Sequence, residues 1–239
     1  MKTAILAILL FCIMIFPHEL GHFIAARRVG VKVNEFAFGM GPAVFQRQKG
    51  ETMYSLRLIP IGGFCAMEGE DEESDDDRAF GNKPAWAKVA ILIAGSAMNL
   101  LIAIAVATIT YHSLVIGWKA TWYLGDLMLN SLGMLITGEV PMSDLSGPVG
   151  IIDLAGDTTT YGWTYFGNLV VLMSLNLAVI NMLPLPALDG GRVLFVIIRK
   201  ILGRRMTDEM EGKIHAIGIM LLFALIIFVT WNDIVRLFT

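Results

Sequence analysis

The sequence predicts an all-α, polytopic membrane protein with about four transmembrane helices and a small membrane-associated β-hairpin region after the first helix. Of the 239 residues, 56% are hydrophobic and only 16% are charged, whereas soluble domains have about 45–50% apolar and about 25% charged residues. Four stretches also reach the roughly 18 apolar residues that a helix needs to cross a bilayer. They cover approximately residues 3–26, 86–111, 164–183 and 214–238.

The first apolar stretch continues directly into charged sequence and lacks the small-residue cleavage site of a signal peptide, so we expect it to be retained. The two cysteines, Cys12 and Cys65, form neither a CxxC pair nor a disulfide framework, so we interpret them as packing residues. The net charge of -3, without a basic stripe, gives no indication of nucleic-acid binding.

Lys and Arg are unevenly distributed among the loops. Nine lie between Arg27 and Lys88 and six between Pro184 and Lys213, but only Lys119 lies in the segment 112–163. Short cytoplasmic loops carry the excess of Lys and Arg. We therefore expect a multi-pass protein of the plasma or inner membrane, with both basic loops in the cytoplasm and both termini outside.

The segments between the spans differ in character. Alternating apolar and polar residues over about 30–65, interrupted by glycines, predict two to four short strands. Eight of the ten residues at 68–77 are acidic, which favours a flexible, solvated loop. The segment 112–163 has about fifty residues and leaves little room for a separate folded domain. We expect a single membrane-embedded domain over 1–239, without an internal repeat.

The first span contains HELGH, which matches the metalloprotease pattern HExxH. Residues four apart share one face of a helix, so His18 and His22 can both present a ring nitrogen to one metal ion, while Glu19 can reach a metal-bound water. The two histidines lie nine and five residues before Arg27, or about 7–13 Å into the span at 1.5 Å per residue. Ionisable side chains at such depth are costly and usually functional.

A catalytic zinc usually has three protein ligands and one open position, so a third ligand is needed. The candidate is Asp189 in NMLPLPALDGGR. Pro184 and Pro186 are expected to break the helix after the third span and to leave Asp189 on an irregular segment that faces the first helix. Gly190 and Gly191 permit either a simple turn or a close backbone approach around Asp189.

HELGH together with NMLPLPALDGG resembles the site-2 protease family of intramembrane zinc metalloproteases, whose signatures are HExxH and NxxPxPxLDGG. GFCAMEGE, NKPAWAKVAILIAG and SGPVG extend the resemblance to the bacterial branch that includes the regulator of sigma-E protease. The resemblance implies that Zn²⁺ is the cofactor, with His18, His22 and Asp189 as its ligands. It also implies that Glu19 is the catalytic acid/base.

The resemblance further implies hydrolysis of peptide bonds within or near transmembrane segments of membrane-protein substrates, such as anti-sigma factors or signal-peptide remnants, in the lipid bilayer. Asn181 is the signature asparagine, and it and Asn176 would hold substrate backbone or a developing oxyanion. The β-rich loop would dip into the membrane and pair with an extended substrate. Two features depart from the branch: the PDZ domain is lacking, and Ser96 replaces a frequent proline.

Several alternatives remain open at the level of sequence. Asn181 and Asn176 could equally form interhelical hydrogen bonds, whereas His112 and His215 are better explained as interfacial side chains than as ligands. A buried polar pair without metal is disfavoured because two signatures agree. A metal transporter lacks support from repeats or a second ligand cluster, and the intact Glu19 argues against a catalytically silent scaffold that binds membrane helices.

Overall fold

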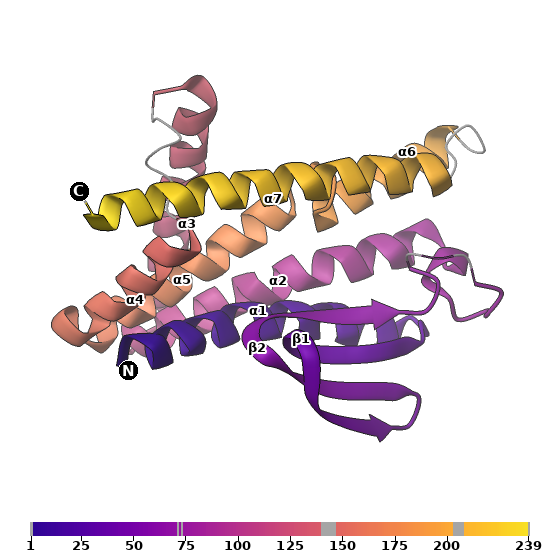
Figure 1. Cartoon of the computed structure of the whole chain (residues 1–239), viewed down its shortest axis with the longest axis horizontal. Helices are drawn as coiled ribbons and strands as arrows, with labels where there is room; N and C mark the ends of the chain where they lie inside the picture. Colours follow the sequence, from indigo (N-terminus) through magenta and orange to yellow (C-terminus); the bar gives the residue numbers. More distant parts are fainter. Residues whose placement is uncertain (1, 71, 73, 140–146, 203–207, 239) are drawn as a thin grey trace. The chain divides into compact units, whose positions relative to one another are not determined.

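The computed structural model describes residues 2–139 except 71 and 73, and residues 147–202 and 208–238. It is mostly helical, with two long strands after the first helix (Figure 1). In chain order the elements are α1 (Lys2–Arg28), β1 (Val33–Lys49), β2 (Thr52–Met67), the short 3-10 helix η1 (Phe80–Asn82), α2 (Ala85–Thr110), α3 (Leu114–Thr137), α4 (Pro148–Tyr161), α5 (Trp163–Asn181), α6 (Asp189–Leu202) and α7 (Asp208–Phe238).

Four of the described helices, α1, α2, α5 and α7, are long and apolar enough to cross a membrane. They contain nearly all of the four apolar stretches that the sequence predicts as spans. The coarse prediction of a mostly helical chain with four membrane-spanning candidates is therefore confirmed. Pro17 lies inside α1 without ending the helix.

The described residues fall into two compact units. One unit consists of Phe11–Asn99 and Leu177–Gly218, and it contains HELGH, both strands and α6. The other consists of the described parts of Met1–Leu10, Leu100–Asn176 and Ile219–Thr239. Every residue of the candidate site described below, apart from Asn176, belongs to the first unit.

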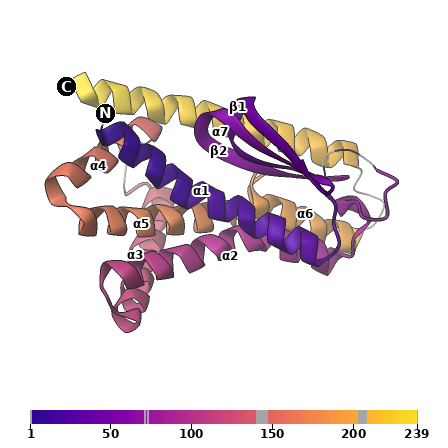
Figure 2. The same cartoon turned by 90° about the horizontal axis from the view of Figure 1, so that it is seen from below.

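β1 and β2 form a two-stranded antiparallel sheet, so the number of strands lies within the predicted two to four, but the strands are long rather than short. Both strands bend, and several register shifts interrupt their pairing. Near the α1 end Ala37 pairs with Phe64, and near the turn Gln48 pairs with Met53. Gly39 at φ +86° lies at the bend, where an added Cβ would collide with the Ile59 carbonyl. The hairpin therefore folds back on itself beside α1 (Figure 2).

The core of this unit joins the end of α1 to the strands and to the start of α2. Its buried members include Ala26, Phe36 and Ile91, and Val193 of α6 packs against them. Gly21 of α1 lies so close to the Ala94 carbonyl of α2 that a Cβ would clash. Contact between backbones brings the faces of α1 and α2 together directly at HELGH.

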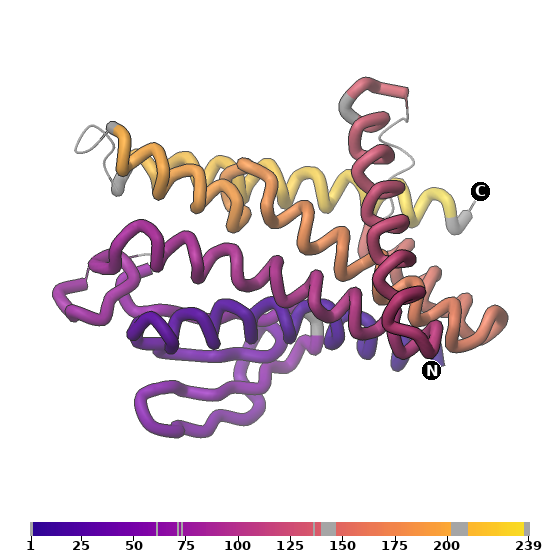
Figure 3. Tube along the Cα trace, turned by 180° about the vertical axis from the view of Figure 1, so that it is seen from behind, coloured from indigo at the N-terminus to yellow at the C-terminus, as the bar shows by residue number. Residues whose placement is uncertain are grey.

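The other unit contains α3 and α4, two helices in the segment that the sequence left without a domain. A tight turn joins α2 to α3 (Figure 3). His112, with φ 51°, lies in this turn, and Ser113 caps α3 by accepting a hydrogen bond from the Ile116 N–H. α4 begins after Gly147. Residues 140–146, including Ser146 of the SGPVG motif, lie outside the described residues.

The acidic segment is more ordered than predicted. The Glu68 carboxylate accepts hydrogen bonds from Ser74, Asn34 and Lys32, and these bonds lower the pKa of Glu68 to about 2. Glu70 is bound to Arg192 of α6. Glu72, Asp75 and Asp77 are exposed, whereas Glu68 and Glu70 are half-buried and have polar partners nearby. Asp71 and Glu73 of this run lie outside the described residues.

Candidate metal centre and active site

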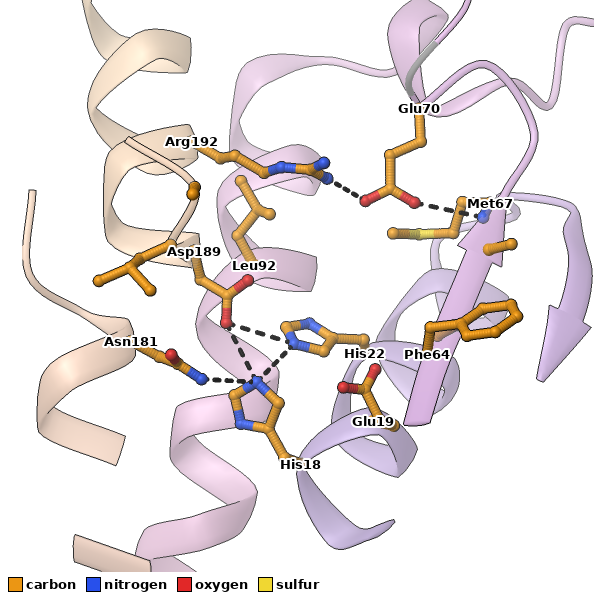
Figure 4. A pocket seen from close by; sticks show the side chains of 14 residues that line it. His18, Glu19, His22, Phe64, Met67, Glu70, Leu92, Asn181, Asp189 and Arg192 are labelled. Atoms are coloured by element: carbon orange, nitrogen blue, oxygen red, sulfur yellow. Dashed lines mark hydrogen bonds and ion pairs between the residues drawn. The ribbon is translucent and has the colours of Figure 1, made fainter. Parts of the chain in front are cut away.

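α1 and the start of α6 bring three ligand-type side chains together (Figure 4). Nε2 of His18 lies 3.2 Å from Nε2 of His22, and Oδ2 of Asp189 lies 3.2 and 3.4 Å from these two nitrogens. A tetrahedral zinc ion with bonds of about 2.0–2.1 Å separates its ligand atoms by about 3.3 Å. The triangle formed by the three atoms has the size that one zinc ion requires.

Both imidazoles are almost fully buried, with His18 5% and His22 7% exposed. Nδ1 of His22 lies 2.9 Å from the Ile91 carbonyl oxygen of α2. A carbonyl only accepts, so Nδ1 carries the proton and Nε2 presents its lone pair to the centre of the triangle. The α2 backbone therefore selects the tautomer of His22 in which Nε2 is free to bind a metal ion.

Asp189 is the first residue of α6. Our prediction that it would lie on an irregular segment is wrong, because the irregular turn ends one residue earlier and a new helix begins at the acid. Gly190 and Gly191 allow this start: a Cβ at either would collide with backbone carbonyls of Met182 or Leu185. Of the two interpretations of these glycines, close backbone approach is confirmed.

His215 of α7 holds the turn that precedes Asp189. Its Nδ1 accepts a hydrogen bond from the Ala187 N–H at 3.0 Å, and its ring packs against Phe195. Ala187 has φ 76°, a conformation that costs an L-residue roughly 1–2 kcal/mol. The sequence favoured an interfacial side chain over a ligand at His215; the structure adds that its ring supports the turn before Asp189, a contact that a lone histidine at a span end does not signal.

A cavity of about 570 Å³ opens beside the triangle. Its walls are the HELGH turn, the end of β2, Asn181 and the first turn of α6. Glu19 lies beside His22 with its carboxylate in this cavity (Figure 4). A carboxylate, three atoms that could bind a metal ion and an open cavity are thus assembled at one place.

Glu70 and Arg192 form an ion pair that lines the same cavity. The other carboxylate oxygen of Glu70 accepts a hydrogen bond from the Met67 N–H at 3.2 Å. The end of β2 is therefore connected to the turn of α6 that follows Asp189. Sequence reasoning did not assign either residue to the site.

The two asparagines differ in position. Nδ2 of Asn181 lies 3.1 Å from Nε2 of His18, so its amide borders the triangle (Figure 4). Asn176 is half-buried on α5, is not among the residues that line the cavity, and belongs to the other unit. Within the first unit the structure brings together His18, Glu19, His22, Asn181 and Asp189.

Comparison with known proteins agrees with this geometry. The model of peptidase family M50 matches residues 6–225, which is most of the chain. This chain belongs to that family. The predicted resemblance to the site-2 proteases is confirmed, and the protein is an intramembrane zinc metalloprotease. Family membership does not favour a transporter or a silent scaffold.

Relatives cover nearly the whole chain. A protein of Clostridium acetobutylicum, named as a candidate zinc metalloprotease, is 31% identical over 330 aligned positions that span 97% of each chain. The regulator of sigma-W protease RasP of Bacillus subtilis is 23% identical over 418 positions, spanning 99% of each. Both alignments are longer than this chain, so the relatives contain residues that it lacks. The predicted lack of a PDZ domain is consistent with its length of 239 residues.

Proposed function

We propose that His18, His22 and Asp189 are the protein ligands of the catalytic zinc and that Glu19 is the general base of peptide hydrolysis. The observation that carries this proposal is the triangle of ligand atoms, 3.2–3.4 Å on each side. Two neutral nitrogens and one carboxylate oxygen are ligands that zinc prefers, and three of them leave a fourth position for water.

Bound zinc would polarise the scissile carbonyl and lower the pKa of its water toward about 7. Glu19 accepts the proton of the attacking water and later donates it to the leaving amine. The Asn181 amide borders the site, 3.1 Å from a ligand nitrogen, and can donate a hydrogen bond to the developing oxyanion. Asn181 lines the cavity, so it is a stronger candidate than Asn176 for the hydrogen-bond donor to the oxyanion.

The end of β2 offers a template for the substrate. Its residues 63–67 pair with β1 on one side, and no other described strand pairs with the opposite edge. Phe64 and Met67 both line the cavity. An extended peptide paired with this edge would lie along the zinc site. A helical substrate must first unwind there, so residues that weaken its helix should favour cleavage.

We further propose that the cavity opens toward the cytoplasm, that both termini lie outside, and that residues 1–239 form one membrane-embedded catalytic domain. The distribution of Lys and Arg among the loops supports this orientation. The related protein of B. subtilis is named a regulator of sigma-W protease. By analogy, the substrates include single-span membrane proteins that control a sigma factor.

The test uses purified protein in detergent and a single-span model substrate. The Glu19→Gln variant should cleave about 10²–10⁴ times more slowly, which is the usual contribution of general acid–base catalysis, while it binds zinc as tightly as the wild type. Zinc-dependent cleavage that persists at the wild-type rate in this variant would contradict the role of Glu19. A silent scaffold would show no cleavage in either protein, and a transporter would show zinc flux into liposomes.

A further inference from the structure

One face of α2 lies directly beneath the two histidines. Ile91, Gly95 and Asn99 are four residues apart, so they share this face. The Ile91 carbonyl contacts Nδ1 of His22. At Gly95 a Cβ would collide with both imidazole rings. Asn99, which is fully buried, contacts Nδ1 of His18 through its amide at 3.3 Å.

The tautomer that zinc requires determines which amide atom must face His18. If Nε2 binds the metal, Nδ1 carries the proton and needs an acceptor. In the structure Nδ2 of Asn99 faces Nδ1 of His18, while Oδ1 accepts no hydrogen bond from any described residue. A half-turn of the amide places Oδ1 in the position of Nδ2, and the oxygen then accepts the Nδ1 proton.

We propose that Asn99 is a positioning residue of the zinc site, which accepts a hydrogen bond from Nδ1–H of His18 through Oδ1 and thereby presents Nε2 of His18 to the metal. This inference rests on the proposed ligand set. α2 then supplies one acceptor to each histidine, the backbone carbonyl of Ile91 and the side-chain carbonyl of Asn99. Partners of this kind orient the ring and raise the basicity of a ligating histidine.

The first experiment measures zinc affinity by competition with a chromophoric chelator. Asn99→Leu has a similar size but no acceptor, and it should bind zinc about 10- to 100-fold more weakly, as is typical when a hydrogen-bond partner of a metal ligand is lost. Asn99→Asp keeps an acceptor and should retain wild-type affinity. Ser96→Ala is the matched control. Its hydroxyl is also buried on α2 and has no hydrogen-bond partner, so its removal should leave zinc binding unchanged.

The second readout is the histidine tautomer, observed by nuclear magnetic resonance of ¹⁵N-histidine-labelled, zinc-loaded protein. The chain has four histidines, which can be assigned by single substitutions. We expect a protonated Nδ1 at His18 in the wild type and in Asn99→Asp, and its loss or exchange broadening in Asn99→Leu. His22, which is held by Ile91, should keep its signal in all three proteins.

Three results would overturn this role for Asn99. They are unchanged zinc affinity and His18 signal in Asn99→Leu, weakening by Asn99→Asp of tenfold or more, and equal disturbance of His18 and His22. If Asn99→Leu does not fold, Asn99→Ala, which also lacks an acceptor, replaces it in both measurements. His18→Ala tests the ligand set independently: full zinc binding there would refute the proposed ligands, whereas failure of the Asn99 test alone would leave them standing.

Discussion

Two acids, Asp189 and Asp233, are largely shielded from solvent in this apolar chain, and their surroundings differ. Asp189 faces two imidazole nitrogens at 3.2 and 3.4 Å and borders a cavity. Asp233 of α7 is 5% exposed and accepts hydrogen bonds from the Gly147 and Gly150 N–H groups at 3.1 and 2.9 Å. The first acid faces side chains that can bind metal, whereas among the described residues the hydrogen-bond partners of the second are backbone donors at the start of α4.

The difference teaches how to interpret a buried acid in a membrane protein. Such a residue is a functional candidate by default because its burial is costly. At Asp233 the cost is offset by the free backbone N–H groups at the start of α4. The positive end of the helix dipole stabilises the carboxylate further. A Cβ at Gly147 would collide with the Asp233 carboxylate, so the contact is closely packed. We interpret Asp233 as a structural link between α4 and α7, and Asp189 as a ligand.

The largest expected effect is that of Asp189→Asn. The amide keeps the shape of the side chain but lacks the anionic oxygen that zinc prefers. Zinc affinity should fall by more than the roughly 10- to 100-fold that loss of an outer partner causes, and cleavage should fall with it. Metal content after dialysis and cleavage of the model substrate measure both.

The unfolding temperature of Asp189→Asn in excess chelator serves as its control, and it should stay close to that of the wild type under the same conditions. Wild-type metal content in this variant would show that Asp189 is not a ligand. Asp189 and Asp233 would then no longer differ in function.

The second expected effect is on stability alone. Asp233→Ala leaves two N–H groups at the start of α4 without their acceptor, at a cost of about 1–3 kcal/mol. The midpoint of thermal unfolding in detergent should therefore fall. Asp233→Asn retains one carbonyl acceptor, so its unfolding midpoint should fall less. Zinc affinity should be unchanged in both variants, so a loss of zinc affinity beyond threefold would place Asp233 in the functional machinery.

The core of the site was predictable because its chemistry has a local signature. His18, Glu19 and His22 lie on adjacent turns of one helix, and Asp189 follows Pro184 and Pro186 in one short motif. The four spans were predictable for a similar reason, since a bilayer-crossing helix requires a continuous apolar run. A pattern that lies within one short segment can be recognised in the sequence without knowledge of the fold.

The residues that support the site were not predictable in this way. Asn99 reaches His18 across 81 positions and Arg192 reaches Glu70 across 122. Such contacts depend on how α1, α2 and α6 pack, and no local pattern encodes that packing. The start of α6 at Asp189 was missed because proline and glycine indicate where a helix stops more reliably than where the next one begins. His215 was missed because a lone histidine carries no spacing.

The smallest expected effect concerns Glu70 and Arg192, which extend the Asp189 region toward the substrate strand. Glu70 accepts the Met67 N–H at the end of β2, and Arg192 joins it to the turn after Asp189. Because the Arg192 side chain is 32% exposed, solvent screens the pair, and we expect its loss to cost about 0.2–1 kcal/mol.

Glu70→Gln and Arg192→Gln should therefore each raise KM by less than about fivefold, while kcat and zinc affinity change little, because the pair aligns the strand rather than the metal. The double exchange Glu70→Arg with Arg192→Glu should recover part of the loss if the charge pair is responsible. Steady-state cleavage of the model substrate separates KM from kcat. A fall in zinc affinity in either single variant would instead mean that the pair supports Asp189 directly. Arg192 and Glu70 would then belong to the metal site rather than to the substrate strand.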